Sequence, residues 1–224
     1  MSTSPQPMFN FSEKLPAYLG GLFIAIELLM YILPQSLQRL SSIYGVLRPI
    51  ETLGATSVTH AVSLIGHGFF HADWSHVLIN TAMIIIFGII TLRAIKLRHA
   101  RARANGGSTG NPNVQFGLIF LAGVIVGGIF QWGWWSISGT VTAGAVGASG
   151  GASALFATSG WALGGRLKMV QFGMGWTLIN IVLVVAEPIF GVSIAWAAHI
   201  GGYVAGMILA PLWVKPNSTG FKIT

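Results

Sequence analysis

The sequence has no cysteine and very little charge. None of its 224 residues is cysteine, which excludes disulfide bonds, thiolate metal sites and a cysteine nucleophile. Only 8% of the residues are charged, against about 25% in an ordinary soluble domain. A soluble fold of this length must cover its surface with charged side chains, and this chain has too few of them. The composition therefore excludes a soluble globular domain and a disordered chain.

Long apolar runs take the place of the missing charge, since 53% of the residues are hydrophobic and the mean hydropathy is +0.72. A helix of about 20 residues crosses the hydrocarbon core of a bilayer. The runs are continuous rather than alternating, which favours helices over the strands of a membrane barrel. We expect an all-α polytopic membrane protein with six transmembrane helices in a domain over 15–214, between tails at 1–14 and 215–224. The runs cover residues 15–33, 75–95, 114–132, 149–164, 169–186 and 193–214.

The basic residues are distributed unevenly between the two predicted sides of the membrane. Of the 12 lysines and arginines, all but Arg39 and Arg48 fall in the tails or in the connections after the second and fourth runs. Because basic loops stay in the cytoplasm, we expect an integral protein of the plasma (inner) membrane with both termini cytoplasmic. The net charge of +7 then reflects orientation and attraction to anionic lipid. It does not indicate a nucleic-acid site, because the basic stretch 93–103 has no interleaved aromatic residues.

Polar residues inside membrane segments are costly, so they are candidates for function. The first such cluster contains His67, His71, His76 and Asn80. His76 and Asn80 are four residues apart and therefore share one helix face, whereas His67 and His71 fall in a predicted loop, where a structural role is an equal alternative. Three histidines suggest a metal, but no HExxH motif is present, and we expect neither a metal nor another cofactor.

A second cluster begins the short fourth run, where Gly147, Ser149 and Gly150 stand close together. A serine at a helix N-terminus can attack a carbonyl group while its own backbone N–H helps to hold the oxyanion. The glycines would let a substrate backbone approach, although glycine and serine are also common packing residues in membrane helices. Ser153, one turn further, is a rival nucleophile.

The third cluster, in the sixth run, combines His199 with a GxxxG pair formed by Gly202 and Gly206. Such a pair lets a neighbouring helix approach closely. Approach of the fourth run would bring His199 within reach of Ser149, where it could act as general base. Glu187 is a less favoured orienting group for His199, so the residues favour a dyad.

Taken together, the three clusters resemble the rhomboid family of intramembrane serine proteases. The family pattern H-x3-H-x4-H-x3-N is matched by the first cluster, and its G-x-S-G by the second. An Ala-His followed by GxxxG is matched by Ala198, His199 and the glycines of the third cluster. These matches occur in the family's order between His67 and Pro211.

The resemblance implies a role for each matched residue. Ser149 would be the nucleophile and His199 the base, while His76, Asn80 and the Ser149 N–H would bind the oxyanion. The substrates would be single-span or multi-span membrane proteins in the lipid bilayer.

The position four residues after Ser149 departs from the family pattern. Family members commonly carry Tyr or Phe four residues after the nucleophile, stacked on the catalytic histidine, where this chain has Ser153. Trp196 and Tyr203 are candidates to hold His199 instead. The sequence names neither the substrate nor the oligomeric state.

Two other classes of function are weaker alternatives. A catalytically idle rhomboid-like protein that binds membrane clients would be expected to lack the serine or the histidine, and both are present. A small transporter or a His-rich metal-binding membrane protein would be expected to show an inverted repeat or acidic residues in the spans. The sequence shows no inverted repeat, and acidic residues are scarce in the apolar runs.

Overall fold

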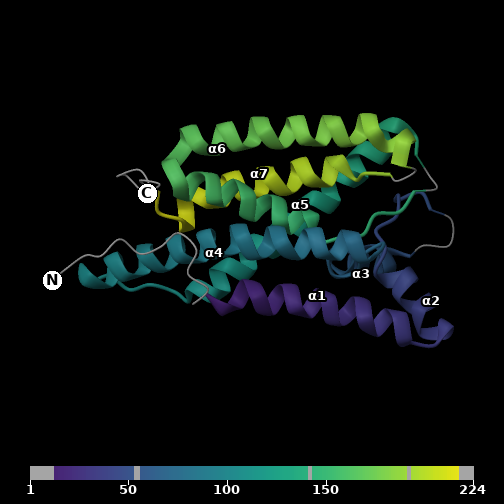
Figure 1. Cartoon of the computed structure of the whole chain (residues 1–224), viewed down its shortest axis with the longest axis horizontal. Coiled ribbons are helices and arrows are strands. Elements are labelled where there is room, and N and C mark those ends of the chain that lie inside the picture. The colour runs from purple at the N-terminus through teal and green to yellow at the C-terminus, as the bar shows by residue number, and fades with distance from the viewer. Residues whose placement is uncertain (1–12, 53–55, 141–142, 191–192, 217–224) are drawn as a thin grey trace.

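The computed structural model describes residues 13–52, 56–140, 143–190 and 193–216, and these residues fold into a bundle of helices (Figure 1). An isolated antiparallel bridge between Leu47 and Ala145 ties two of the connecting loops together. The prediction of an all-α fold is therefore confirmed for the described residues. In chain order the elements are α1 (Lys14–Ile32), α2 (Gln35–Tyr44), α3 (Ser57–Gly66), the 3-10 turn η1 (His67–Phe69), α4 (Trp74–Ala104), α5 (Pro112–Ser138), α6 (Ser149–Phe190) and α7 (Trp196–Trp213).

In the described part of the chain, four helices are long and apolar enough to cross a membrane, namely α1, α4, α5 and α6. The predicted count of six is not confirmed, because α6 takes in both the fourth and the fifth apolar runs and α7 (the sixth) is not among these four. The backbone of α6 leaves the helical region only at Gly164 and at Gly165, where φ is 63°, a value that favours glycine. The helix reverses direction there (Figure 1). We call residues 149–163 the first leg of α6 and residues 166–190 its second leg.

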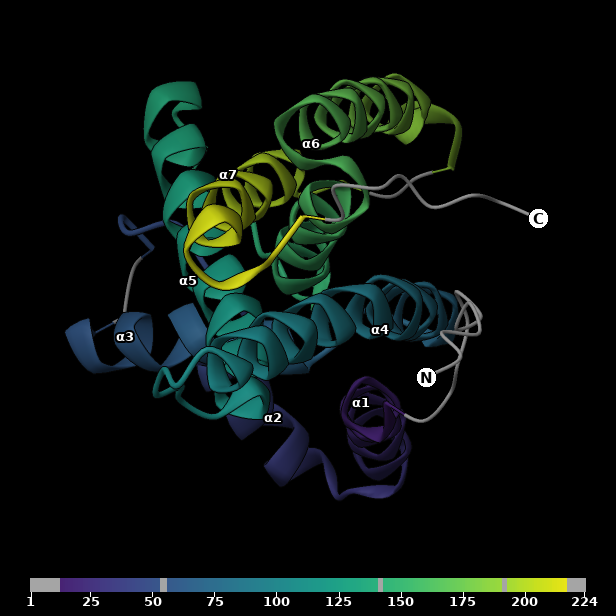
Figure 2. The same ribbon diagram turned by 90° about the vertical axis from the view of Figure 1, so that its left-hand side faces the viewer.

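The first leg lies inside the bundle, among α4, α5 and α7, while α1 packs outside against α4 (Figure 2). Apart from Phe156, every residue from 150 to 160 is buried. Small residues make this enclosure possible because neighbouring backbones can approach them closely. A Cβ on Gly123 of α5 would lie 2.7 Å from the Gly150 carbonyl oxygen, and one on Gly206 of α7 would lie 2.4 Å from that of Ala154. Ser149 therefore begins a tightly enclosed helical segment.

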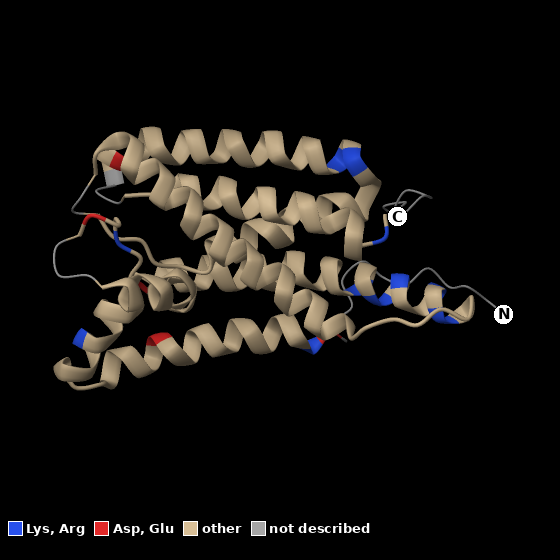
Figure 3. Cartoon of the chain, turned by 180° about the vertical axis from the view of Figure 1, so that it is seen from behind, with Lys and Arg blue, Asp and Glu red and all other residues tan. Residues whose placement is uncertain are grey.

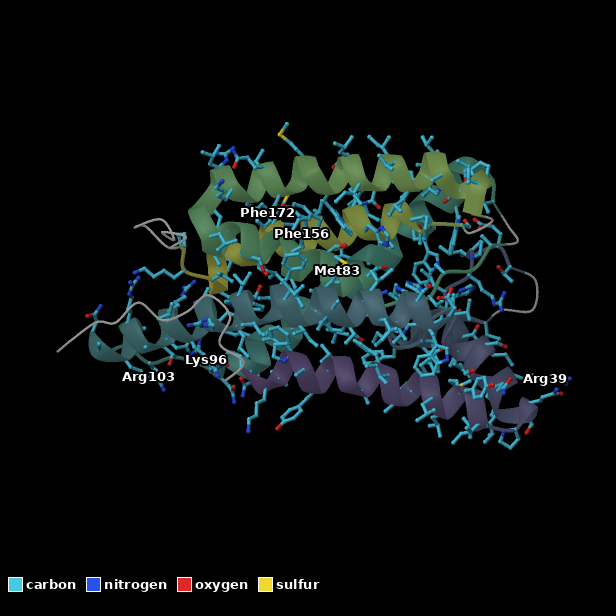
Figure 4. The ribbon with its side chains drawn as sticks, viewed as in Figure 1. Arg39, Met83, Lys96, Arg103, Phe156 and Phe172 are labelled. Atoms are coloured by element: carbon cyan, nitrogen blue, oxygen red, sulfur yellow. The ribbon has the colours of Figure 1, made fainter. Side chains whose placement is uncertain are left out.

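The second leg lies at the edge of the bundle and presents only a narrow stripe to it. Between residues 166 and 189, Met169, Trp176 and Asn180 are buried, and their spacing of seven and four residues puts them on one helix face. Phe172 of this leg stacks on Phe156 of the first leg with ring centroids 4.9 Å apart (Figure 4). Most other side chains of the second leg are exposed.

Lysine and arginine gather at the end of the bundle where α1 begins and α7 ends (Figure 3). Lys96 of α4 forms an ion pair with Glu13, just before α1. Arg98 donates to the carbonyl of Leu212 near the end of α7. The two ends of the described chain therefore lie on the same side of the bundle. Of the predicted tails, residues 1–12 and 217–224 lie outside the described residues.

Candidate active site

The first turn of α4 fixes His76 and Asn80. Asp73 caps this helix, and its carboxylate accepts a hydrogen bond from the His76 N–H at 2.8 Å. The Asn80 amide nitrogen donates to the His76 carbonyl at 2.9 Å, and the side chain is 2% exposed. That bond uses one of the two amide hydrogens and leaves the second available. The predicted sharing of one helix face by these residues is thus present.

His67 joins the 3-10 turn to the loop before α6. It is buried, its Nδ1 bonds to the Ser63 carbonyl at 2.9 Å, and its own carbonyl accepts from the Gly147 N–H at 2.8 Å. His67 therefore holds the loop that precedes Ser149, which fits the structural alternative left open by the sequence.

His71 lies between that loop and α4. Its ring centroid is 5.1 Å from that of His76, and its Nε2 is 3.4 Å from the Ala148 N–H. Burial, followed by repulsion from His76, lowers the pKa of His71 to about 4, so the ring is neutral at neutral pH. Among the described residues, no group of three His, Cys, Asp or Glu side chains is arranged to hold a metal ion.

Gly147 brings His76 and Ser149 to the same place. Its φ is 124°, a conformation that L side chains rarely adopt. A Cβ on Gly147 would lie 2.7 Å from Nε2 of His76 and 3.7 Å from Oγ of Ser149. Ser149 is half-buried and is the first residue of α6, so its N–H has no partner within the helix.

Ser153, the rival nucleophile, is directed elsewhere. The side chain is fully buried, and its hydroxyl donates to the Ser149 carbonyl at 2.7 Å, one turn back along its own helix. The arrangement therefore favours Ser149 over Ser153 as the reactive hydroxyl.

The predicted close approach of α7 to the first leg of α6 is present. A Cβ on Gly202 would lie 2.1 Å from the Gly150 carbonyl oxygen, and a Cβ on Gly206 would meet the backbone of Ala154. Gly150 follows Ser149 directly, and Gly202 lies one turn after His199. The elements that carry Ser149 and His199 are therefore in backbone contact at this level of the bundle.

His199 is held by two residues of the second leg that sequence reasoning missed. Its Nδ1 lies 2.6 Å from Oδ1 of Asn180, and its ring lies 5.5 Å from that of Trp176. Both residues sit within an apolar run, and their contact with α7 depends on the reversal at Gly164 and Gly165. No spacing signal in the sequence could have revealed it.

The three other residues considered for holding His199 have different partners. Glu187 does not orient it, because its carboxylate accepts from the Ile194 N–H at 2.6 Å. Trp196 packs on Trp134, with ring centroids 4.8 Å apart, and the Tyr203 hydroxyl donates to the Met169 carbonyl. Neither aromatic ring takes the place that Ser153 leaves open.

An apolar groove of about 550 Å³ runs between the second leg and α7. Trp176, Tyr203 and Met207 are among its lining residues, whereas Ser149 and His199 are not. The lining contains no carboxylate or imidazole, so the polar cluster rather than the groove is the candidate active site. That cluster combines a hydroxyl at a helix N-terminus, an imidazole and further N–H donors, which are the groups needed for acyl transfer.

Comparison with known proteins agrees with this arrangement. A family model described as the rhomboid domain matches residues 58–216. The chain is also 26% identical over 210 residues to uncharacterized proteins of Mycobacterium bovis and Mycobacterium tuberculosis, covering 87% of this chain and 74% of each relative. Rhomboid proteins are integral membrane proteins and usually serine proteases that act on membrane-protein substrates within the bilayer. The chain therefore belongs to the rhomboid family, as the three polar clusters of its sequence indicated.

Proposed function

We propose that the protein is an intramembrane serine protease that hydrolyses peptide bonds in or near transmembrane segments of other membrane proteins. The observation that carries this proposal is the backbone contact between Gly202 and Gly150. It puts the helix that bears His199 against the helix that begins with Ser149.

In the proposed reaction, the Ser149 hydroxyl attacks the substrate carbonyl carbon and gives its proton to Nε2 of His199. The Ser149 N–H, the His76 ring and the second amide hydrogen of Asn80 stabilise the oxyanion. His199 then protonates the leaving amine, and a water molecule hydrolyses the acyl-enzyme by the same steps. One oxyanion donor is typically worth about 3–4 kcal/mol.

We further propose that α1, α4, α5, the two legs of α6, and α7 all cross the bilayer, making a six-helix membrane domain over residues 15–214. The basic end, with the tails 1–14 and 215–224, would face the cytoplasm, in the plasma membrane. The active site would then open near the opposite surface. Helical peptide bonds are shielded by their hydrogen bonds, so a substrate helix must unwind locally, which glycine or proline would ease.

The proposal is tested by cleavage of a panel of single-span membrane proteins by purified enzyme in proteoliposomes. Ser149→Ala and His199→Ala should abolish cleavage, and Asn80→Ala should lower kcat/KM about 10²-fold. Ser153→Ala is the matched control, because its hydroxyl only bonds within its own helix, and it should remain active.

A fluorophosphonate should label the wild-type protein on Ser149 and fail to label Ser149→Ala. Full activity of Ser149→Ala would disprove the assignment of the nucleophile. If the wild-type protein binds membrane proteins but neither cleaves them nor reacts with the probe, it is instead a client-binding protein.

A further inference from the structure

Asn180 is the polar residue in the narrow stripe that the second leg of α6 presents to the bundle. Its side chain is 3% exposed, and the stripe's other buried residues are Met169 and Trp176. A buried amide away from water must find hydrogen-bond partners within the protein. Both ends of the Asn180 amide do so.

The two hydrogen bonds of Asn180 fix the orientation of its amide. The nitrogen Nδ2 donates to the Trp176 carbonyl one turn back, at 2.8 Å. The oxygen Oδ1 is thereby left to face α7, where it lies 2.6 Å from Nδ1 of His199. An amide oxygen can only accept a hydrogen bond, so the hydrogen between these two atoms belongs to Nδ1 of His199.

This assignment determines the other ring nitrogen. A neutral imidazole carries one N–H, so a hydrogen on Nδ1 leaves Nε2 as the proton acceptor. In the described part of the chain the His199 ring bonds to Asn180 and to no carboxylate. Glu187 bonds to Ile194, and Asp73 caps α4. Asn180 therefore occupies the place that a carboxylate would take beside a histidine base.

We propose that Asn180 is a positioning residue that holds His199 in the tautomer whose Nε2 can accept the Ser149 proton. The same bond to Nδ1 stabilises the imidazolium that forms when the proton is transferred. Trp176, one turn before Asn180, packs beside the ring and restricts its rotation. The inference rests on the proposed function, because the tautomer matters only if His199 acts as a base.

The kinetic test compares three variants of the second leg in the cleavage assay. Asn180→Leu removes the acceptor at similar size and should lower kcat about 10²-fold or more, with little change in KM. Asn180→Asp keeps an acceptor, so it should recover much of that loss. Its negative charge should also move the acidic limb of the kcat–pH profile to higher pH, because it stabilises the imidazolium. Val182→Thr, at an exposed position of the same leg that does not line the groove, is the control and should match wild type.

A second measurement does not depend on cleavage. In protein labelled with ¹⁵N-histidine, the ring ¹⁵N shifts show which nitrogen carries the hydrogen, and His199→Gln identifies the signals. We expect the Nδ1–H form in wild type and its loss or mixture in Asn180→Leu. An Nε2–H form of His199 in wild type would overturn the proposal even if Asn180→Leu does not fold.

The two proposals fail in different ways. Active wild-type enzyme with an equally active Asn180→Leu variant would disprove the role of Asn180 and leave the protease intact. Wild type that cleaves nothing and resists the fluorophosphonate would disprove the protease, while the NMR result would still decide whether Asn180 sets the tautomer.

Discussion

Single residues were predictable where the chemistry follows fixed spacing along the chain. His76 with Asn80, and His199 with Gly202, stand at helical intervals within apolar runs, and the structure keeps each pair on its helix as expected. Asn180 could not be found in this way, because no histidine or serine lies near it in sequence. Its importance comes from a residue 19 positions away along the chain. Spacing along the chain also does not show backbone conformation, such as the positive φ of Gly147 beside His76 and Ser149.

Gly147→Ala should impair the site through geometry alone. The substitution places a methyl group 2.7 Å from the His76 ring on a backbone whose φ is 124°. We expect at least a tenfold loss of cleavage rate and about 1–3 kcal/mol of lost stability. Gly139→Ala is the control, since φ there is also positive but nothing lies within 4 Å of the added carbon. Equal cleavage rates for the two variants would contradict the prediction.

Because of Asp73, the stability of the α4 N-terminus should decrease at acidic pH. Hydrogen bonds from the Ser75 hydroxyl and the His76 N–H lower the pKa of this carboxylate below its ordinary value of 3.8. The charged form is thus favoured in the folded state, so its contribution is present above the ordinary pKa. It is lost as the pH falls through the lowered value.

We expect thermal unfolding in detergent between about pH 5 and pH 2 to show this loss in wild type. Asp73→Asn, which keeps a capping oxygen without a charge, should show less of it. The effect is small because the carboxylate is exposed and screened by solvent. Identical pH dependence in the two proteins would exclude Asp73 as its source.

The ends of whole helices were predictable where polar residues separate one apolar run from the next. The run at 15–33 became α1, and the basic stretch after the second run became an extension of α4. The fourth and fifth runs are an exception. They belong to the single element α6, in which the chain reverses direction at Gly164 and Gly165. Which face of the second leg packs inward could not be predicted, since that leg is apolar around most of its circumference.

Gly202→Ala should separate α7 from the first leg of α6. The added carbon would lie 2.1 Å from the Gly150 carbonyl oxygen, and a backbone atom cannot move aside as a flexible side chain can. Overpacking of this kind costs about 1–3 kcal/mol, so we expect a lower Tm in detergent and a slower cleavage rate. Gly175→Ala, with nothing within 4 Å of the new carbon, should leave both unchanged. A Gly202→Ala protein as stable and active as wild type would show that the close contact is absent.

At the scale of the whole molecule, the distribution of charge was the feature most easily predicted from the sequence. Arg103 and Lys96 lie at one end of α4, and Arg39 lies at the opposite end of the molecule (Figure 4). The sequence predicted this separation because basic residues cluster in particular connections. The packing of α1 mainly against α4, at the outside of the bundle, left no such mark in composition.

The orientation of the molecule can be tested with single cysteines, because the natural sequence has none. Ser42→Cys, at the end of the bundle away from the basic cluster, should react with an impermeant maleimide on intact cells. Ser108→Cys, in the exposed loop after α4, should react only after the membrane is permeabilised. The reverse pattern would contradict a cytoplasmic position for the basic end.

The unequal packing of the two legs of α6 has a consequence for the environment in which the protein works. Ser149 begins a leg enclosed by protein, whereas Asn180 and Trp176 belong to a leg whose other neighbours in a membrane are acyl chains. Extraction into detergent would therefore replace the surroundings of the leg that holds His199 and leave those of the leg that begins with Ser149 unchanged.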